Sequence, residues 1–295
     1  MNYATIFKPG LFEGRTVIIT GGGSGIGRCV GHEIAALGGQ VWLLGRDQAK
    51  LDAVVAEIRA TGGLAEARQC DIRDEDQVRA TVGAAAASGP IHGLVNNAGG
   101  QFRSPAASIS AKGWRAVVDT NLTGGFLMAR EAYVQSMQHS GGAIVNIAAD
   151  FANGMTLMAH SGAARAGMVN LTETLAAEWA PVRINAVAPG PIASSGMDSY
   201  PPEAAPALRA IPSQIPAGRW GLEAEVSAAV VFLLSDAAAF ISGACLRVDG
   251  GAPSARRRWT MPERAPAPEF DAFPLAIRPR ALATVPDIDE GDHPS

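Results

Sequence analysis

The fold of this chain is decided by one stretch of its sequence, Thr20-Gly21-Gly22-Gly23-Ser24-Gly25-Ile26-Gly27. It follows a short apolar run at residues 16–19 and precedes a helical pattern at residues 26–37. Glycines let the backbone turn tightly and approach a pyrophosphate, and the N-terminus of the next helix offers N–H groups to the phosphates. Surface loops also collect glycine, but the flanking strand and helix favour a dinucleotide-binding turn.

Short apolar segments alternate with longer helical patterns on both sides of this turn. Strands are predicted at residues 16–20, 40–44, 65–70, 93–96, 143–148, 183–188 and 244–248. Helices are predicted at residues 26–37, 48–61, 75–87, 111–139, 161–180 and 224–234. Strands separated by helices indicate βαβ units and a parallel sheet covered on both faces. The pattern therefore predicts an α/β protein with a doubly wound Rossmann-type sheet.

The composition indicates a globular protein with a sizeable core. The chain has 295 residues, of which 47% are hydrophobic and 18% charged, and its net charge of −4 argues against a nucleic-acid partner. Cys29, Cys70 and Cys245 show neither metal-ligand nor redox spacing. The sequence has no signal-peptide pattern and no apolar run long enough to span a bilayer. We expect a cytoplasmic protein that binds neither a metal nor a membrane.

The composition changes after Gly251. Residues 252–295 are rich in proline and contain the cluster Arg256-Arg257-Arg258 and an acidic end, yet they keep Trp259, Phe270 and Phe273. We predict one domain over residues 11–251 and a largely irregular arm over residues 252–295. The retained apolar residues predict that this arm lies on its own domain or on a neighbouring subunit, and that it frays after about Pro286.

Three further motifs stand after predicted strands or in the helix between them. They are Asn97-Ala98-Gly99, Asn121 within Thr120-Asn121-Leu122-Thr123-Gly124, and Asn185-Ala186-Val187-Ala188-Pro189-Gly190-Pro191-Ile192. With residues 20–27 they resemble the short-chain dehydrogenase/reductase family over roughly residues 11–251. The resemblance implies seven parallel strands and hydride transfer to or from a nicotinamide cofactor.

The resemblance also implies which residues bind that cofactor. The glycine turn would hold the pyrophosphate, Asp71 the adenine, and the segment after strand six the nicotinamide. The implied set is Gly21, Ser24, Gly25, Ile26, Gly27, Asp71, Asn97, Ala98, Gly99, Pro189, Gly190, Ile192 and Ser194. Two members have structural alternatives: Asn97 could tie neighbouring strands together, and Asp71 could cap the helix that begins near Glu75.

The end of the second strand indicates which nicotinamide cofactor is used. An acidic residue there would bond the ribose 2′-OH and repel a 2′-phosphate, whereas this chain has Arg46, followed by Asp47. An arginine can pair with a phosphate through two hydrogen bonds. We therefore expect NADPH rather than NADH, the alternative being that Arg46 is a solvated charge at the start of a helix.

The chain departs from the family at the residues that carry carbonyl chemistry. Most members have a Ser and then a Tyr-x-x-x-Lys motif, in which the Tyr exchanges a proton with a carbonyl oxygen and the Lys lowers its pKa. Here Ala149 stands at the Ser place, Ser161 at the Tyr place and Arg165 at the Lys place. No phenol is left to protonate an alkoxide.

This departure favours C=C over C=O chemistry. Ketone reduction needs an acid at the oxygen. Reduction of a C=C bond conjugated to a thioester spreads the charge into an enolate, which needs hydrogen-bond donors at the thioester oxygen and a proton at the α-carbon. The sequence is compatible with that reaction and leaves the proton donor open.

A closer resemblance indicates the same chemistry. The runs at residues 101–106, 110–114 and 160–167 are similar to the peroxisomal trans-2-enoyl-CoA reductase branch, which is related to the 2,4-dienoyl-CoA reductases. The Tyr residues associated with those two groups map to Val169 and Asp150 here. The resemblance therefore implies an acyl-CoA substrate without supplying a proton donor.

Four residues are the catalytic candidates, and each has a structural alternative. Asn121 could bond a substrate oxygen or only bend its helix. Asp150 could act as an acid if burial raised its pKa, or could be a turn residue. Ser161 could donate to an enolate or cap its helix. Arg165 could hold the nicotinamide ribose or form a surface salt bridge. Besides these four candidates, His160 could donate or cap the same helix as Ser161.

The sequence thus predicts an NADPH-dependent enoyl-thioester reductase acting on trans-2-enoyl-CoA. The alternatives are an NADP-dependent alcohol or carbonyl dehydrogenase, on terpenoid or fatty alcohols for example, and a cofactor-binding protein with little redox activity. Arg103, Lys112 and Arg115 are possible contacts for the CoA phosphates. The helical stretches at residues 121–139 and 161–180 resemble those that pair subunits in this family. Their small residues, such as Ala163, Ala164, Ala166 and Gly167, allow close helix approach, so we expect a homodimer or homotetramer.

Overall fold

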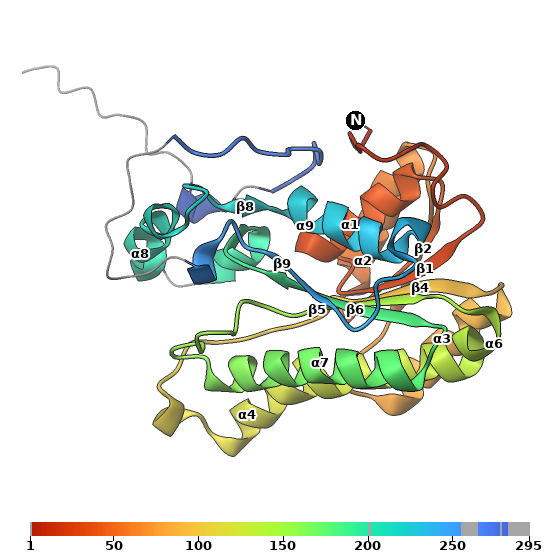
Figure 1. Cartoon of the computed structure of the whole chain (residues 1–295), viewed down its shortest axis with the longest axis horizontal. Coiled ribbons are helices and arrows are strands. Elements are labelled where there is room, and N and C mark those ends of the chain that lie inside the picture. The colour runs from red at the N-terminus through yellow and green to blue at the C-terminus, as the bar shows by residue number, and fades with distance from the viewer. Residues whose placement is uncertain (1, 200–201, 255–264, 278, 283–295) are drawn as a thin grey trace, which may run out of the picture.

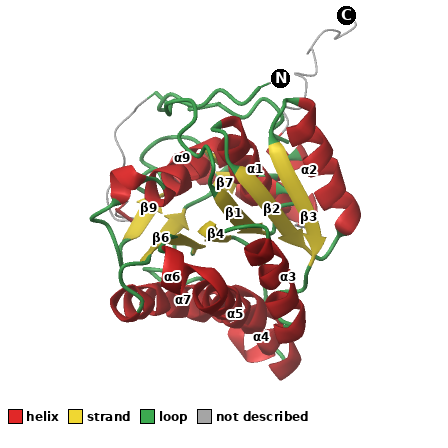
Figure 2. Ribbon diagram, turned by 90° about the vertical axis from the view of Figure 1, so that its right-hand side faces the viewer, coloured by secondary structure: helices red, strands yellow, loops and turns green. Residues whose placement is uncertain are grey.

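The computed structural model describes residues 2–199, 202–254, 265–277 and 279–282, and its centre is a seven-stranded parallel sheet (Figures 1 and 2). The strand order is β3-β2-β1-β4-β5-β6-β9. The bounds are β1 Thr16–Thr20, β2 Gln40–Gly45, β3 Leu64–Gln69, β4 Ile91–Asn96, β5 Ala143–Ile147, β6 Arg183–Pro189 and β9 Cys245–Val248. The order reverses between β1 and β4, which confirms the predicted doubly wound fold.

Helices cover both faces of this sheet. Figure 1 shows α1, α2 and α9 on one side and α3, α4, α6 and α7 on the other, and Figure 2 shows α5 beside α4 and α7. The bounds are α1 Gly25–Ala36, α2 Gln48–Ala60, α3 Glu75–Ala87, α4 Ala111–Val118, α5 Gly124–Ala132, α6 Gln138–Ser140, α7 Ala159–Glu178, α8 Ala205–Arg209 and α9 Glu223–Leu234.

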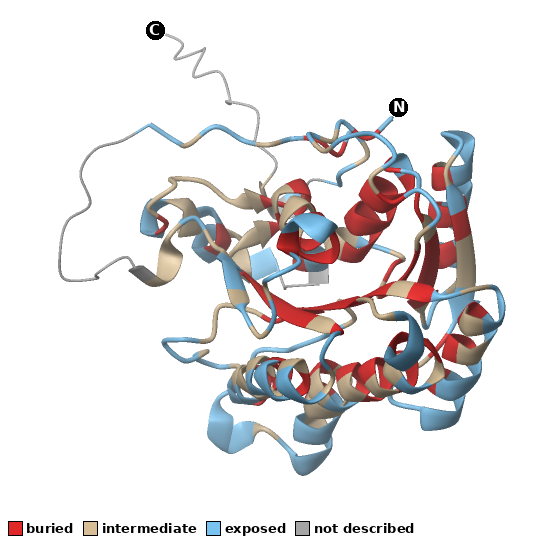
Figure 3. Cartoon of the chain, turned by 45° about the vertical axis from the view of Figure 1, so that its right-hand side comes forward, coloured by how far each residue is buried: buried red, intermediate tan, exposed pale blue. Residues whose placement is uncertain are grey.

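The core consists of two apolar layers, one on each face of the sheet. Successive residues of β1 alternate between them: Val17 and Ile19 belong to the layer under α1, α2 and α9, and Ile18 to the layer over α3, α5 and α7. Figure 3 shows the buried residues along the sheet and on the inward sides of the helices. Because both faces are covered, β1 and β5 are continuous buried runs.

The helix predicted over residues 111–139 is interrupted twice. Residues Asp119–Thr123 and Tyr133–Met137 form π-helical segments, which separate α4, α5 and α6. A π-helical turn inserts one residue per turn and redirects the side chains that follow it, a feature often found at functional sites. The first of these turns contains Asn121.

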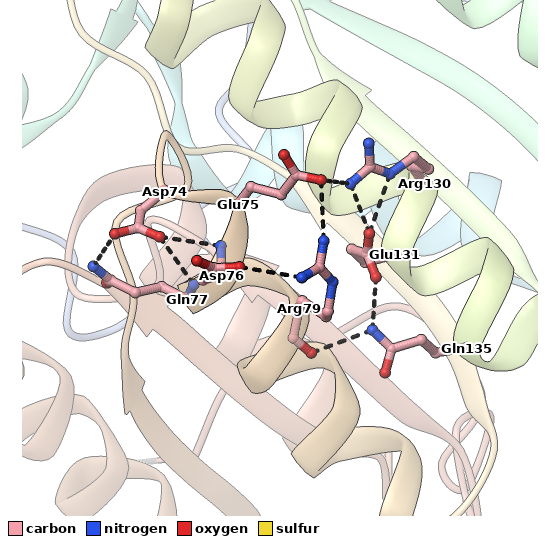
Figure 4. A network of polar contacts seen from close by, with 8 residues as sticks. All are labelled: Asp74, Glu75, Asp76, Gln77, Arg79, Arg130, Glu131 and Gln135. Atoms are coloured by element: carbon pink, nitrogen blue, oxygen red, sulfur yellow. Dashed lines mark hydrogen bonds and ion pairs between the residues drawn. The ribbon is translucent and has the colours of Figure 1, made fainter.

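A polar network on the surface joins α3 to α5 (Figure 4). Asp74 caps α3 by accepting from the backbone N–H groups of Asp76 and Gln77. Arg130 on α5 pairs with Glu75 on α3 and with its neighbour Glu131. These contacts hold α3 and α5 side by side.

The segment between β6 and α9 was not predicted in detail. It contains a second, two-stranded parallel sheet formed by β7 (Ile192–Ala193) and β8 (Gly221–Leu222), with α8 and several single 3-10 turns between them. Strands of two residues are too short to leave a periodic pattern in the sequence.

The described part of the arm lies against the N-terminal segment and α1. Ala4 donates its backbone N–H to the carbonyl of Ala272, and Phe273 packs among Tyr3, Cys29 and Ala224. Arg256–Arg258 and the end after Pro286 lie outside the described residues. Within the described residues, no helix combines the length and apolarity that crossing a membrane requires. Cys29, Cys70 and Cys245 are unpaired thiols.

Candidate functional site

The glycine turn between β1 and α1 has a backbone that only glycine fits. Gly21 and Gly25 have φ angles of +68° and +56°. A Cβ on Gly27 would overlap the carbonyl oxygen of Gly21. The first turn of α1 contains no acidic residue, and the Ser24 side chain makes no capping hydrogen bond. The N-terminal N–H groups of α1 can therefore receive an anion, and this cradle fits a dinucleotide pyrophosphate.

A cavity of about 450 Å³ adjoins this turn at the carboxyl ends of the strands. It brings together most of the predicted adenosine-side residues, and its lining includes Gly21, Ser24, Arg46, Asp71, Ala98 and Gly99. Lys50 and Arg73 also line it and were not predicted. The position and size fit the adenosine part of a dinucleotide at the topological switch point.

The two charged residues predicted in this cavity, Arg46 and Asp71, have different surroundings. Arg46 is exposed, while the adjacent Asp47 caps α2 by accepting from the backbone of Lys50. Asp71 is paired with Arg73, which holds the pKa of that carboxyl below its usual range. The cap of α3 is Asp74, so the alternative that Asp71 caps this helix is wrong.

Asn97 ties the end of β4 to the glycine turn. Its Nδ2 donates to the carbonyl of Thr20 at 2.9 Å, and its backbone N–H donates to Thr20 Oγ1 at 3.0 Å. Thr20 Oγ1 in turn donates to the carbonyl of Val95. These contacts show that Asn97 ties neighbouring strands together, which was its structural alternative. Ala98 and Gly99, which follow it, line the cavity.

Asn121 positions the loop after β4. Its Oδ1 accepts from the N–H of Gly100, and its Nδ2 donates to the carbonyl of the same residue, both at 2.9 Å. The side chain is 2% exposed. Both the carbonyl oxygen and the NH2 of its amide are bonded to Gly100, so Asn121 fixes this loop to the π-helical turn that contains it.

Arg165 is an enclosed cation without a carboxylate. On α7, it reaches back to the sheet, where Nη1 donates to the carbonyl of Ile147, and its Nη2 fills the space that a side chain on Gly99 would need. No ion pair to Arg165 exists among the described residues, so the salt-bridge alternative is wrong there. Burial lowers its pKa to about 10, which leaves the guanidinium charged at neutral pH.

Ser161 and His160 lie inside α7 and do not cap it. The helix begins at Ala159 and its N-cap is Met158, so the capping alternatives for both residues are wrong. Ser161 Oγ donates to Gln101 Oε1 at 2.9 Å. His160 Nδ1 accepts from the N–H of Ser161, and its Nε2 is buried without a hydrogen-bond partner in the described part of the chain.

Asp150 follows β5 and lies half-buried beside a second carboxylate. Burial and the neighbouring Asp249 raise the pKa of Asp150, and Arg247 opposes the shift. Its backbone N–H donates to the carbonyl of Pro189. Asp249 was missed by the sequence reasoning, because only the β6–β9 pairing brings it here.

The segment that follows β6 leaves the sheet against Asp249. A Cβ on Gly190 would come within 2.7 Å of Asp249 Cα. Ile192 lines a separate cavity of about 320 Å³ with Arg219, Gly221 and Glu225. Ser194 and the four catalytic candidates, Asn121, Asp150, Ser161 and Arg165, do not line either of these two cavities.

A parallel doubly wound sheet with an anion-binding glycine turn at its switch point defines a dinucleotide-dependent protein of the Rossmann type. The family model described as enoyl-(acyl carrier protein) reductase matches residues 21–253. The chain belongs to the short-chain dehydrogenase/reductase family and is an oxidoreductase.

Relatives in this family differ in what they act on. The chain is 38% identical over 247 residues to a probable 2,4-dienoyl-CoA reductase of Bacillus subtilis. The aligned residues cover 81% of this chain and 96% of the relative. It is 53% identical to the solved structure of a citronellol catabolism dehydrogenase of Pseudomonas aeruginosa, with a TM-score of 0.77 over 85% of this chain and 99% of that one.

A third relative was solved with its cofactor. It is a candidate NAD(P)-dependent gluconate 5-dehydrogenase from Beutenbergia cavernae with NADP bound at low occupancy. The identity is 36% and the TM-score 0.79, over 84% of this chain and all of that one. These likenesses support a nicotinamide cofactor at the glycine turn.

Proposed function

We propose that this protein is an NADPH-dependent reductase of the C=C bond of a trans-2-enoyl-CoA. The observation that carries the proposal is the site of Arg165, where an enclosed guanidinium replaces the family's Lys and Ser161 replaces its Tyr. A guanidinium is a permanent cation and hydrogen-bond donor, but it does not release a proton at neutral pH. Such a site can stabilise an anion more readily than it can protonate an alkoxide.

The residues present would divide the work as follows. The nicotinamide, when bound, supplies the hydride. Arg165 holds the ribose and stabilises negative charge that develops on the thioester oxygen. Asn121 keeps the loop at Gly100 in place, and the hydroxyl of Ser161, which donates to Gln101 in this structure, would turn to the substrate as a second donor. Asp150 is the candidate source of the proton at the α-carbon, because burial and Asp249 raise its pKa above the usual carboxyl value.

The cofactor proposed is NADPH, and the support for it lies in the adenosine cavity. Arg46 and Lys50 both line the cavity and are exposed. Two cations beside the end of β2 favour a 2′-phosphate over a bare ribose hydroxyl. The relative solved with NADP is consistent with this preference.

An acyl-CoA substrate is supported by the 2,4-dienoyl-CoA reductase relative. Arg103, Lys112 and Arg115 are exposed on and beside α4, where they can reach the phosphates of a CoA group. We also propose a homo-oligomer that pairs through α5 and α7. Ala164, predicted to line such an interface, is 1% exposed and faces the interior of the chain instead.

A second candidate function is an NADP-dependent alcohol dehydrogenase. It is favoured by the 53% identity to a citronellol catabolism dehydrogenase. Ser161 stands at the family's catalytic Tyr position. This weighs against a dehydrogenase, because alcohol oxidation needs a base at the hydroxyl.

The test is a comparison of two substrate panels on the purified protein. We expect NADPH oxidation with crotonyl-CoA or decenoyl-CoA and none with ketones. Turnover of citronellol with NADP⁺, without turnover of either enoyl-CoA, would favour the dehydrogenase. Tight NADPH binding with no turnover in either panel would favour a cofactor-binding protein with little redox activity.

A further inference from the structure

A buried carboxyl group, that of Glu223, lies directly beside the glycine turn. Glu223 is the first residue of α9 and is 4% exposed. Its Oε1 lies 3.7 Å from the point where a Cβ on Gly25 would stand. Gly25 is the first residue of α1, so the carboxyl group lies next to the helix end that fits a pyrophosphate.

The position of Glu223 is held from two sides. Glu223 directly follows β8, which pairs with Ile192 and Ala193 of β7, the segment predicted to meet the nicotinamide. On the other side, α9 packs along α1, and Ser227 Oγ on α9 donates to Glu33 of α1. Glu223 therefore lies between the segments predicted to hold the two halves of the cofactor.

The carboxyl group of Glu223 has no hydrogen-bond donor among the described residues. Its neighbour Glu33, which is also buried, accepts hydrogen bonds from Tyr3, Thr5 and Ser227. The nearby cation, Arg28, is committed to Glu57 and to the carbonyl of Leu275. An unpartnered buried carboxyl group beside an anion site is costly when ionised.

The surroundings of Glu223 explain why its pKa is raised. Arg28 and Cys29 face it from α1, while Glu33 of α1 and Tyr3 of the N-terminal segment lie beside Cys29 in the same cluster. Burial raises the pKa of Glu223 to about 7, and Arg28 opposes the shift only in part. The thiol of Cys29 and the phenol of Tyr3 have raised pKa values, so both stay neutral near pH 7.

We propose that Glu223 couples cofactor binding to protonation, because its ionised carboxylate repels the pyrophosphate at the Gly25 turn and its neutral form does not. Binding of the dinucleotide then takes up a proton at Glu223. The proposal rests on the nicotinamide cofactor and not on the acyl substrate, so its failure would leave the proposed reaction intact.

The first test measures the Kd of NADPH and of NADH between pH 6 and pH 8 without substrate. The protonated fraction of a group with a pKa of about 7 falls from about 0.9 to about 0.1 over this range, so the wild-type Kd should rise by up to about tenfold. NADH carries the same pyrophosphate without a 2′-phosphate, so the rise should appear with both cofactors.

Two variants assign the effect to Glu223. In Glu223→Gln, the part of the pH dependence of Kd that comes from this carboxyl should be lost for both cofactors. Glu33→Gln is the matched control, a buried glutamate of the same cluster with its own donors, and should keep the wild-type pH dependence. An unchanged pH dependence in Glu223→Gln would overturn the proposal.

A calorimetric measurement on the wild-type protein needs no variant. NADH binding at pH 7 in buffers of different ionisation enthalpy should show net uptake of a fraction of a proton per site. Binding without proton uptake would overturn the proposal even if Glu223→Gln failed to fold.

Discussion

Arg165 combines three properties at one residue: it is enclosed, it has no carboxylate partner in the described chain, and it stays charged despite a pKa lowered to about 10. We predict that Arg165→Gln lowers kcat/KM with an enoyl-CoA by about 100-fold, as expected when one preorganised donor is removed from an oxyanion site. Arg165→Lys should retain part of the activity because the charge remains. Steady-state kinetics with crotonyl-CoA measure both.

Arg183 provides a matched control for this substitution. It is also a partly buried arginine whose guanidinium donates to backbone carbonyls, those of Leu233, Leu234 and Ser235. It lies at the start of β6, at the opposite end of the sheet from the glycine turn. Arg183→Gln should lower stability and leave kcat/KM of the folded protein near wild type. Equal losses of activity in both variants would contradict a specific role for Arg165.

The raised pKa of Glu223 also leads to a prediction about stability. Its pKa rises from an ordinary value of 4.5 to about 7 in the folded state, so folding favours the protonated form. That contribution is complete below about pH 4.5 and is lost as the pH rises to about 7, amounting to about 3 kcal/mol at most. Urea unfolding at pH 5 and pH 8 should show that Glu223→Gln gains stability relative to wild type at the higher pH. A difference that is the same at both pH values would contradict it.

The sequence could indicate single residues but not their partners. Ser161 and Arg165 were recognisable from their spacing, because the motif places both on one helix. Gln101, which accepts from Ser161, and Asp249, which lies beside Asp150, come from distant segments. Glu223 has an ordinary sequence context, and only the packing of α9 on α1 gives it a functional position.

At the scale of elements, central strands such as β1 and β5 were predictable because a sheet covered on both faces needs continuous apolar runs. The same reasoning placed α1, α2 and α3 within a residue or two of their observed ends. It could not place β7 and β8, which are set by their pairing with each other. Nor could it separate α4 from α5, since a π-helical turn leaves no signature in hydrophobic spacing.

The turn between β1 and α1 makes a prediction about one of these elements. A Cβ on Gly27 would overlap the carbonyl oxygen of Gly21 and press on the side chain of Asn97. Gly27→Ala should therefore lower the free energy of unfolding by about 1–3 kcal/mol and weaken NADPH binding at least about tenfold. Chemical unfolding measures the loss of stability, and a fluorescence titration measures the weaker NADPH binding.

Gly162 on α7 is the control for Gly27→Ala. A Cβ there would make an ordinary contact at 3.4 Å with Met155. Gly162→Ala should leave stability unchanged or raise it by up to about 1 kcal/mol, because alanine favours a helix. If Gly27→Ala behaved like this control, the close backbone approach at the turn would not be a constraint on the sequence.

At the scale of the whole molecule, the arm joins regions that are far apart in the chain. Its residues 265–277 contact Arg219, which donates to the carbonyls of Ala267 and Pro268 and pairs with Glu225 of α9. Further along, Arg28 of α1 donates to the carbonyl of Leu275. The described N-terminal residues and residues 265–277 of the arm therefore pack on the pair of helices that borders the glycine turn, α1 and α9.

This arrangement predicts that the arm contributes to the stability of the whole domain through Phe273. The ring is 2% exposed and lies 5.0 Å from the His32 ring and 5.0 Å from the Arg28 guanidinium. Truncating a fully buried phenylalanine typically costs about 3–5 kcal/mol. We expect Phe273→Ala to lower the free energy of unfolding by about 3 kcal/mol in urea. It should also weaken NADPH binding, because α1 loses its outer cover.

Ile277→Ala is the control on the same arm. Ile277 is 53% exposed, so its loss should change stability by less than about 0.5 kcal/mol. Equal unfolding midpoints for Phe273→Ala and wild type would show that the arm does not share the cooperative unit of the domain.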